Sequence, residues 1–483
     1  MIIIIYIILI FNFIQSAYNI NPENIAISGS SSLAYNDFRS INPASLANHK
    51  GLSIKLIGFN FGFDNNFLSI SKYNDINGAN FEDNTDPNYY SKSELYDIFN
   101  SGININSHLA FNLPFSDIVF NNISFHNRVY FINKSSLPQS FVKLLLYGNE
   151  PNETYNLNAS SNVNIFTESA LGYSIKSEDL LYGFKIKYLQ GLVYSELDNL
   201  SDNSSFFITD TTTGFMGEAK YLINQSVGGS GFALDLGLIY EYSNKIKLGI
   251  SINNLFGQIN WNDNNMTYNL FRDNIISKLP LRFNEKQYIS ITLDTLNAMN
   301  IISLPLNEIY KIEEFSVIEF GSLDDIPLSI DSLLISGSLI ETEVGTYLLK
   351  SKNLSSNQIK SFNLKSEYFK TEYPTNINLS LLRKFEDKIH ISTSLESAFS
   401  NNLRNSEKWK FSLGIIFNRL KNQPITFGFS IQEKGKIFSG FSYGYKAGPL
   451  QINHGIRFND AIFFQSTKGI DFSLSILFKT NKF

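Results

Sequence analysis

The chain has 483 residues, of which 43% are hydrophobic, 14% aromatic and 17% charged, whereas a soluble domain usually has about 25% charged residues. The net charge of −5 excludes a basic surface for nucleic acid, and the absence of cysteine excludes disulfides, thiolate metal sites and a cysteine nucleophile. Charged residues are scarce while Phe and Tyr are abundant, and the spacing of the apolar residues becomes the main source of information.

The N-terminus is almost wholly apolar. Residues 1–14 read MIIIIYIILIFNFI, and Gln15, Ser16 and Ala17 follow. This pattern predicts a secretory signal peptide over residues 1–17, although no Lys or Arg precedes the apolar run. The alternative is a membrane anchor, but about 14 apolar residues fall short of the ~20 that span a bilayer. No later stretch is long and apolar enough for a membrane helix.

Two short amphipathic helices are predicted in the first third of the chain. Residues 91–102 begin with the capping-box pair Ser91 and Glu94 and end at a glycine. Residues 138–148 begin with Pro138 and end with Gly148. We expect both helices to cap the mouth of the fold, with gating of a lumen or a contact surface as the alternatives.

Apolar residues alternate strictly in the middle of the chain. Residues 232, 234, 236, 238, 240 and 242 are aromatic or leucine, while the residues between them are mostly small or polar. This period of two predicts a strand with one apolar face. Eleven residues, tilted by about 45°, rise about 25 Å, the height of the apolar band of an outer-membrane barrel. A turn at Asn244 and Lys245 leads into the next alternating run.

The C-terminal third repeats the alternation as a series of hairpins. The predicted strands cover residues 377–381, 389–395, 411–417, 425–431, 441–445 and 472–478. A turn at residues 386–387 and a polar loop over 400–408 separate some of them. Phe478, rather than Phe483, is the expected terminal aromatic residue for the barrel insertion machinery. Several strands and large loops are expected between residues 261 and 370.

The polar strand face distinguishes between two kinds of β-protein. A soluble sandwich exposes Lys, Glu and Arg on that face, whereas here Ser, Gly, Asn and Thr predominate, as in a barrel interior. No linker divides the chain. The sequence therefore predicts an all-β fold, a transmembrane antiparallel outer-membrane β-barrel, with an exported soluble β-protein as the alternative.

A family resemblance agrees with this interpretation. Asn42-Pro43-Ala44-Ser45-Leu46 resembles the Asn-Pro-Ala-x-Leu segment of barrels similar to the long-chain fatty acid transporter and to the type IX secretion shuttle. Residues 137–150, 188–197, 229–237 and 252–261 resemble an uncharacterised bacterial barrel family within that group. The resemblance implies about 14 strands, an N-terminal plug segment over 18–51 containing Asn42, Pro43, Ala44 and Leu46, and a barrel over 52–483. It implies no established activity.

No catalytic, cofactor-binding or metal-binding residues are predicted. The histidines at 49, 108, 126, 390 and 454 are scattered, and His390 lies on a polar strand face where it could meet a serine and an acid. The Gly228–Gly231 run precedes a strand rather than a helix, which predicts the end of a loop and no phosphate site.

Two non-enzymatic functions remain open. The first is passive uptake or export of a hydrophobic small molecule, which would pass the segment near Asn42 and leave through the lumen or laterally. The second is a barrel that docks secreted protein cargo or a secretion system through its outer loops. The expected surroundings are outer-membrane lipid, with no cofactor and no nucleic acid.

Overall fold

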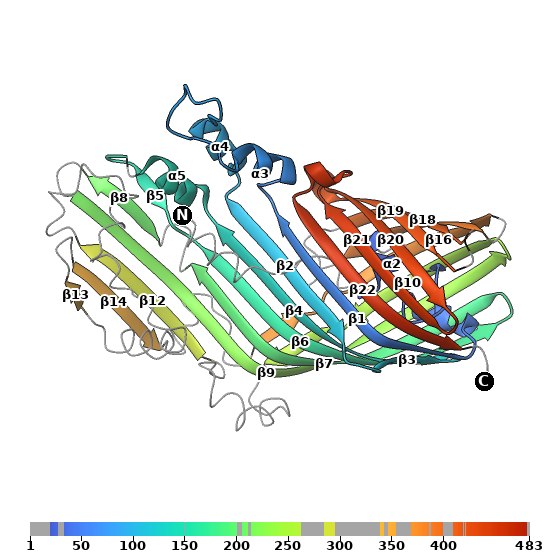
Figure 1. The fold of residues 1–483 in the computed structure, drawn as a ribbon. Helices are drawn as coiled ribbons and strands as arrows, with labels where there is room; N and C mark the ends of the chain where they lie inside the picture. The colour runs from blue at the N-terminus through green and yellow to red at the C-terminus, as the bar shows by residue number, and fades with distance from the viewer. Residues whose placement is uncertain are drawn as a thin grey trace.

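The computed structural model is a cylinder of strongly tilted strands (Figure 1). It describes residues 20–27, 33–148, 150–199, 205–210, 214–261, 285–294, 339–341, 346–353, 369–385, 388–398, 409–418, 420 and 422–480. The predicted signal peptide, the turn at 386–387, the loop over 400–408, Phe483 and most of residues 262–368 lie outside this part.

The strands form a closed ring. Within the described residues, antiparallel pairing runs through fourteen strands and returns to its start, because β22 pairs with β1. This closure leaves no free edge around the ring and confirms the predicted barrel. In order, the ring contains β1 (Leu52–Asn65), β2 (Ile103–Asn112), β4 (Ile123–Leu137), β6 (Ser160–Ser177), β7 (Leu180–Asn199), β9 (Gly214–Ser243), β10 (Ile246–Leu255), β16 (Asn376–Phe385), β17 (Ile389–Ala398), β18 (Trp409–Phe417), β19 (Ile425–Gln432), β20 (Ile437–Ala447), β21 (Leu450–Asn459) and β22 (Gly469–Thr480).

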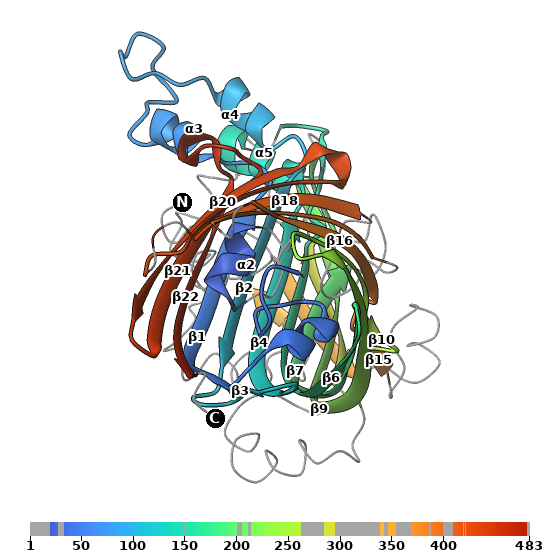
Figure 2. The same cartoon turned by 90° about the vertical axis from the view of Figure 1, so that its right-hand side faces the viewer.

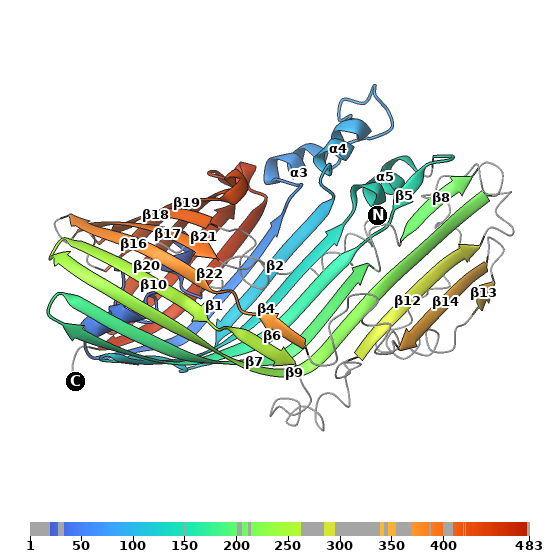
Figure 3. The same ribbon diagram turned by 180° about the vertical axis from the view of Figure 1, so that it is seen from behind.

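Shorter strands extend the ring. β3 pairs with β1 and β4 beyond the end of β2, and β11 pairs with β15 beyond β10 and β16. β12 pairs with the first part of β9, and β14 and β13 follow it (Figure 3). The bounds are β3 (Asp117–Phe120), β5 (Thr154–Asn156), β8 (Phe206–Asp210), β11 (Gln258–Trp261), β12 (Glu285–Asp294), β13 (Leu339–Glu341), β14 (Thr346–Asn353) and β15 (Phe369–Glu372).

The two ends of the barrel differ. One end has tight turns, such as Asn244-Lys245, and the other has long connections that contain α3 (Ile70–Ile76), α4 (Lys92–Ile98) and α5 (Gln139–Tyr147). The two predicted helices correspond to α4 and α5, while α3 was missed. The predicted capping bond at Ser91 does not form. Short 3-10 turns, η6 (Glu433–Gly435) and η7 (Phe464–Ser466), lie in later connections. No described helix is both long and apolar enough to cross a membrane.

The polarity of the wall is inverted relative to a soluble protein. In β9, Phe232 is 64% exposed, whereas Asp235, three residues later and on the opposite face of the strand, is 2% exposed. In β1, Lys55 and Asn60 are completely buried. Apolar side chains therefore face outward and polar ones inward, which is the arrangement of a transmembrane barrel.

The N-terminal segment lies inside the ring (Figure 2). Its helix α2 (Pro22–Ala26) is fully buried and contacts β19 to β22. The Ser473 hydroxyl of β22 donates a hydrogen bond to the Ile20 carbonyl at 3.1 Å. A second element, the 3-10 helix η2 (Pro43–Asn48), contacts β6, β7 and β9.

Candidate functional site

Asn42 joins the N-terminal segment to the barrel wall. It precedes η2, where its side-chain oxygen accepts a hydrogen bond from the Ala44 amide at 3.0 Å. Its side-chain nitrogen donates to the carbonyl oxygens of Ile250, at 3.0 Å, and Leu238, at 3.3 Å. One side chain thus begins the helical turn and binds two neighbouring strands, β10 and β9.

Glycines allow this close approach. A Cβ added at Gly237 would lie 2.0 Å from the Asn42 side-chain oxygen, and one at Gly183 would lie 2.4 Å from the Ala44 nitrogen. Both distances are far below van der Waals contact, so no other residue fits there without displacing the segment. The wall is therefore only backbone thick at the point where Asn42, Pro43 and Ala44 lie against it.

Apolar contacts also hold the N-terminal segment against the inner wall. Ala44 packs with Leu33 from the same segment and with Leu181, Ile239 and Leu382 from the wall. Leu46 packs with Phe38, Val119 and Leu477. The four residues singled out from the sequence, Asn42, Pro43, Ala44 and Leu46, are therefore all buried against the inner wall.

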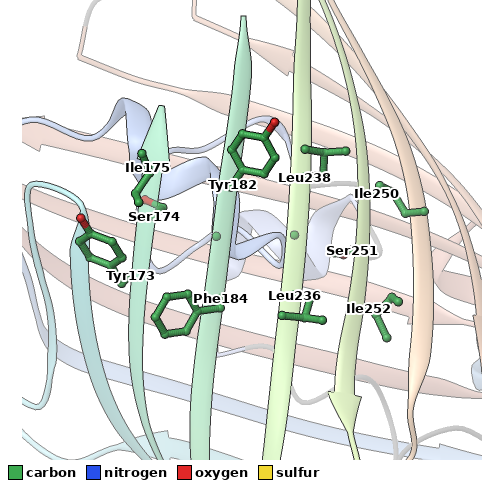
Figure 4. Close-up of a pocket in the computed structure, with 12 residues that line it drawn as sticks. Tyr173, Ser174, Ile175, Tyr182, Phe184, Leu236, Leu238, Ile250, Ser251 and Ile252 are labelled. Carbon is green, nitrogen blue, oxygen red and sulfur yellow. The ribbon is translucent and has the colours of Figure 1, made fainter. Parts of the chain in front are cut away.

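Figure 4 shows the outer surface of the same wall. Tyr182, Phe184, Leu236, Leu238 and Ile250 are among the side chains that line a groove of about 380 Å³ there. Gly183 and Gly237 also line it. An apolar outer groove and the N-terminal segment thus lie on opposite sides of the same two glycines.

A buried ion cluster ties the segment together. Arg39 contacts Glu23 at 2.7 Å and Asp37 at 2.9 Å, and Lys479 of β22 contacts Asp37 at 2.7 Å. Burial opposes ionisation of Asp37, but Arg39 and Lys479 outweigh it and hold the pKa of this carboxyl well below 3.8. The two halves of the segment and the last strand therefore share one set of charges.

A band of charges runs along the inner wall from β1 through β3, β4, β6 and β7 to β9. Lys55 and Arg128 both contact Asp117, at 3.0 and 2.8 Å. Lys187 contacts Asp235 at 2.8 Å. The two remaining members, His126 and Glu168, meet at 2.9 Å. We call these seven residues the charge band.

An aromatic cluster lies next to the charge band, on the side of the long connections. The register places Arg128 opposite Glu168, and the next inward pair along these strands is Tyr130 and Phe166. The rings of Tyr130 and Phe166 lie 5.1 Å apart. The cluster also contains Tyr194, Trp261, Phe369 and Tyr373, together with aliphatic residues such as Leu189, Ala233 and Ile259. The barrel interior thus changes from charged to apolar within one row of residues.

The wall is interrupted beside this cluster, between β10 and β11. Asn254 and Phe256 both have φ near +58°, and the register with β9 shifts between Ile252 and Leu255. The Asn254 amide donates to the Asp235 carboxylate at 2.8 Å, and its side chain donates to the Pro374 carbonyl at 3.1 Å. Because side-chain contacts hold this backbone, the ladder to β9 stops and resumes only at Asn260.

A second apolar groove, of about 380 Å³, lies outside the interruption. Its lining includes Ile186, Phe232, Leu234 and Phe256, whose side chain is 79% exposed. Ala233 lines this groove and also belongs to the interior aromatic cluster. At this height, a single small residue separates the apolar interior from the apolar surroundings.

One expectation about local chemistry is corrected. The Gly228–Gly231 run is no loop ending but lies within β9, which is 30 residues long. Within it, Gly228 has φ +81° where the register with β7 shifts, and Ile259 and Trp261 pack in the space that side chains at Gly191 and Gly229 would fill. His126 pairs with an inward acid, Glu168, which also accepts a hydrogen bond from Tyr373 at 2.5 Å.

The fold and its polarity define a transmembrane β-barrel of the outer-membrane type. The chain belongs to a family of unknown function, DUF5723, whose model matches residues 43–310, more than half of the sequence. This match confirms the resemblance to an uncharacterised family. No curated protein matches the chain significantly.

Several solved barrels have a similar architecture. The toluene transporter TodX of Pseudomonas putida is 11% identical, with 96% of this chain and 99% of that chain covered and a TM-score of 0.48. A FadL homologue of Pseudomonas aeruginosa is 11% identical, with 97% and 99% covered and a TM-score of 0.45. The toluene transporter TbuX of Ralstonia pickettii is 10% identical, with 96% and 99% covered and a TM-score of 0.44. Such distant similarity does not indicate what this chain binds.

Proposed function

We propose that this protein is an outer-membrane channel that passes a hydrophobic small molecule from the aromatic cluster into the lipid, through the interruption between β10 and β11. The observation that carries this proposal is the position of Ala233, which lines both the apolar interior and the outer groove. An apolar ligand on this path never needs to enter the charge band.

The charge band supports a lateral rather than an axial path. An apolar molecule that displaced the Lys187–Asp235 or Arg128–Asp117 pair would deprive buried charges of a main partner, and breaking a buried pair costs up to about 3–5 kcal/mol. The N-terminal segment, proposed as a plug over residues 18–51, adds a second obstruction through its described part, which is held by Asn42, Pro43, Ala44 and Leu46. Leaving sideways avoids both.

The height of the interruption identifies where the ligand would leave. Ten residues separate Lys245 at the tight turn from Leu255, and at a tilt of about 45° they rise about 23 Å. The apolar band of such a barrel is about 25 Å high. The ligand would therefore enter the leaflet nearer the long connections.

Closing the groove tests this path. The chain has no cysteine, so the double variant Phe232→Cys, Phe256→Cys can be bridged by a reducible thiol crosslinker. In Gram-negative cells that express the protein, we expect uptake of the apolar dye N-phenyl-1-naphthylamine to fall to the rate of cells lacking it. Uptake should recover after reduction.

The matched control is Phe427→Cys, Phe441→Cys. These two residues lie directly opposite each other on the uninterrupted wall of β19 and β20, so the same bridge there should leave uptake unchanged. If bridging the groove has no effect, the lateral path is wrong. If the protein never accelerates uptake and instead co-purifies with secreted proteins, the docking alternative replaces the proposal.

A further inference from the structure

A polar pocket of about 360 Å³ lies at the end of the barrel with the long connections. It is formed by β2, β4, β6 and β7, and Leu197 is the one apolar residue in its described lining. Ligand pockets usually measure about 300–1,000 Å³. This pocket is therefore large enough for a small ligand, and it is distinct from both apolar grooves.

Four of its residues form a continuous row across four strands. The register places Asn106 opposite Lys134, Lys134 opposite Asn162, and Asn162 opposite Glu196. Opposite side chains in antiparallel pairs lie about 4.5–5.5 Å apart. The row therefore presents an amide, an ammonium, a second amide and a carboxylate at regular spacing.

The row lies on the inner face. Two residues further along the same strands, on the same side, Ile132, Asn164 and Tyr194 are all buried in the interior. Asn162 donates a hydrogen bond to the Tyr194 hydroxyl at 3.1 Å. The Tyr194 ring in turn lies 5.6 Å from that of Trp261. The aromatic cluster thus forms the floor of the polar pocket.

The chemistry of the row selects a hydroxylated ligand. The lining carries charges of both signs, so a ligand carboxylate would meet Glu196 and Asp198 as well as Lys134, and a ligand ammonium would meet Lys134 as well as the two carboxylates. Amides both donate and accept hydrogen bonds, whereas Lys only donates and an ionised Glu only accepts. A hydroxyl group also does both. Adjacent hydroxyls can therefore bond to every member of the row, in addition to the bonds that Asn106 donates to Asp64 at 3.2 Å and Asn162 donates to Glu196 at 3.5 Å.

Two neighbouring amides point to the same chemistry. Asn164, next to Asn162 on the inner face of β6, is 0% exposed, and Asn224, opposite Glu196 on β9, is 1% exposed. Neither the oxygen nor the nitrogen of either amide has a hydrogen-bond partner among the described residues. Buried polar groups are normally paired, so polar atoms without protein partners lie close to the pocket, although neither amide lines it.

We propose that this pocket binds a neutral polyhydroxylated ligand of the sugar class, held by the row Asn106, Lys134, Asn162 and Glu196 above Tyr194. The row shares no residue with the outer grooves, although Tyr194 beneath it belongs to the aromatic cluster where the lateral path begins. It adds a polar ligand to a protein whose other candidate surfaces are apolar.

Trp261 provides a reporter for this site. The chain has two tryptophans, and Trp409 lies on the outer wall with 43% exposure. In Trp409→Phe protein, we expect maltose, cellobiose or trehalose to change the remaining fluorescence saturably. Gluconate, a hydroxylated carboxylate, and choline, a hydroxylated cation, should bind at least ten-fold more weakly. Equilibrium dialysis with the labelled disaccharides gives a second readout.

Two asparagine variants distinguish binding at this pocket from a general effect of losing a buried amide in the lumen. Asn162→Leu should weaken disaccharide binding about ten-fold, as expected for the loss of one or two hydrogen bonds. The control is Asn378→Leu, because Asn378 is also a buried inward amide but lies on β16. Heat-dependent mobility on SDS gels verifies that each variant is folded.

Three outcomes would overturn the proposal. They are absence of binding in both readouts, equal weakening by the two asparagine variants, and tighter binding of gluconate or choline than of the disaccharides. Bridging the two introduced thiols of the Phe232→Cys, Phe256→Cys variant should leave disaccharide binding unchanged. The lateral path and the sugar site can therefore fail separately.

Discussion

The Asn42 side chain donates a hydrogen bond to the main-chain carbonyl of Ile250, at 3.0 Å and 208 residues further along the chain. The same nitrogen also reaches the Leu238 carbonyl. Because β9 and β10 meet at these two carbonyls, the N-terminal segment is attached to the backbone of the wall rather than to its side chains. Substitutions of the outward side chains there should leave this attachment intact.

Asn42→Leu should release residues 33–50 from the wall while the barrel stays folded. The variant loses two hydrogen bonds to carbonyls and one to Ala44, each with a net value of about 0.5–1.5 kcal/mol. We expect faster amide hydrogen exchange in this segment and unchanged exchange in β1 to β22. Ile250→Val is the control, since it keeps the carbonyl. Equal exchange in both variants would show that Asn42 does not anchor the segment.

Arg39→Ala should loosen the same segment more strongly. It leaves the Asp37 and Glu23 carboxylates, each 3% exposed, without their shared guanidinium, and losing one partner of a buried pair costs about 3–5 kcal/mol. Arg39→Lys should fall between, because an ammonium cannot bind both carboxylates with a planar fork. The rate of proteolysis within residues 33–50 ranks the variants. Faster cleavage of Arg39→Lys than of Arg39→Ala would contradict this prediction.

Attachment of the segment should weaken in two separate pH ranges. Burial is the main cause that lowers the pKa of His49 below 6.5, so the attached state binds fewer protons and loses stability as pH falls below 6.5 through this lowered pKa. The pKa of Asp37 lies below 3.8, so its contribution is complete above 3.8 and is lost only at lower pH.

Hydrogen exchange of residues 33–50 between pH 7 and pH 5, corrected for intrinsic exchange, measures the His49 contribution alone. We expect His49→Gln to remove the pH dependence in this range and Asp37→Asn to preserve it, although at lower overall protection. A pH dependence that survives in His49→Gln would assign the titration to another group.

The barrel could be predicted from sequence because alternation is local. The outward Phe232 and the inward Asp235 differ in burial simply because neighbouring residues of a strand face opposite ways. The length of β9 could not be predicted, because glycines at 228, 229 and 231 carry no side chain to show the alternation. Their place in the strand also involves residues far away in sequence, because Ile259 and Trp261 of another strand fill the space beside Gly229.

The candidate site could be predicted only in part. Asn42 to Leu46 could be singled out because they resemble a family motif, and these consecutive residues are buried together as one short segment. The charge band and the interruption at Asn254 depend instead on partners far away in sequence, such as Asp235 and Pro374. The inward parity of Lys185, Lys187 and Asp235 was a readable signal for charges in the lumen, but not for which of them meet.

Asp235→Ala should destabilise the barrel at the interruption between β10 and β11. It removes the acceptor of the Asn254 amide and leaves Lys187, at 4% exposure, without its 2.8 Å partner. We expect a loss of about 3–5 kcal/mol in unfolding free energy, and a smaller loss for Asp235→Asn, which retains an acceptor oxygen. Urea unfolding from lipid vesicles measures both, and equal losses would show that the charge, not the acceptor, decides the outcome.

Lysine substitutions along the outer face of β16 should depend on depth. Leu379 and Phe385 share this outward face, where they are 47% and 39% exposed, and six residues of tilted strand separate them by about 14 Å of height. A lysine costs about 2–4 kcal/mol at the middle of the bilayer and about 0–1 kcal/mol near its edge. We therefore expect Leu379→Lys to lower the unfolding free energy in vesicles far more than Phe385→Lys does.

Arg383 already lies on this face near the strand end, beside the Phe385 ring at 4.8 Å, so a charge is tolerated there. Equal losses in the two variants would mean that the apolar face does not meet lipid.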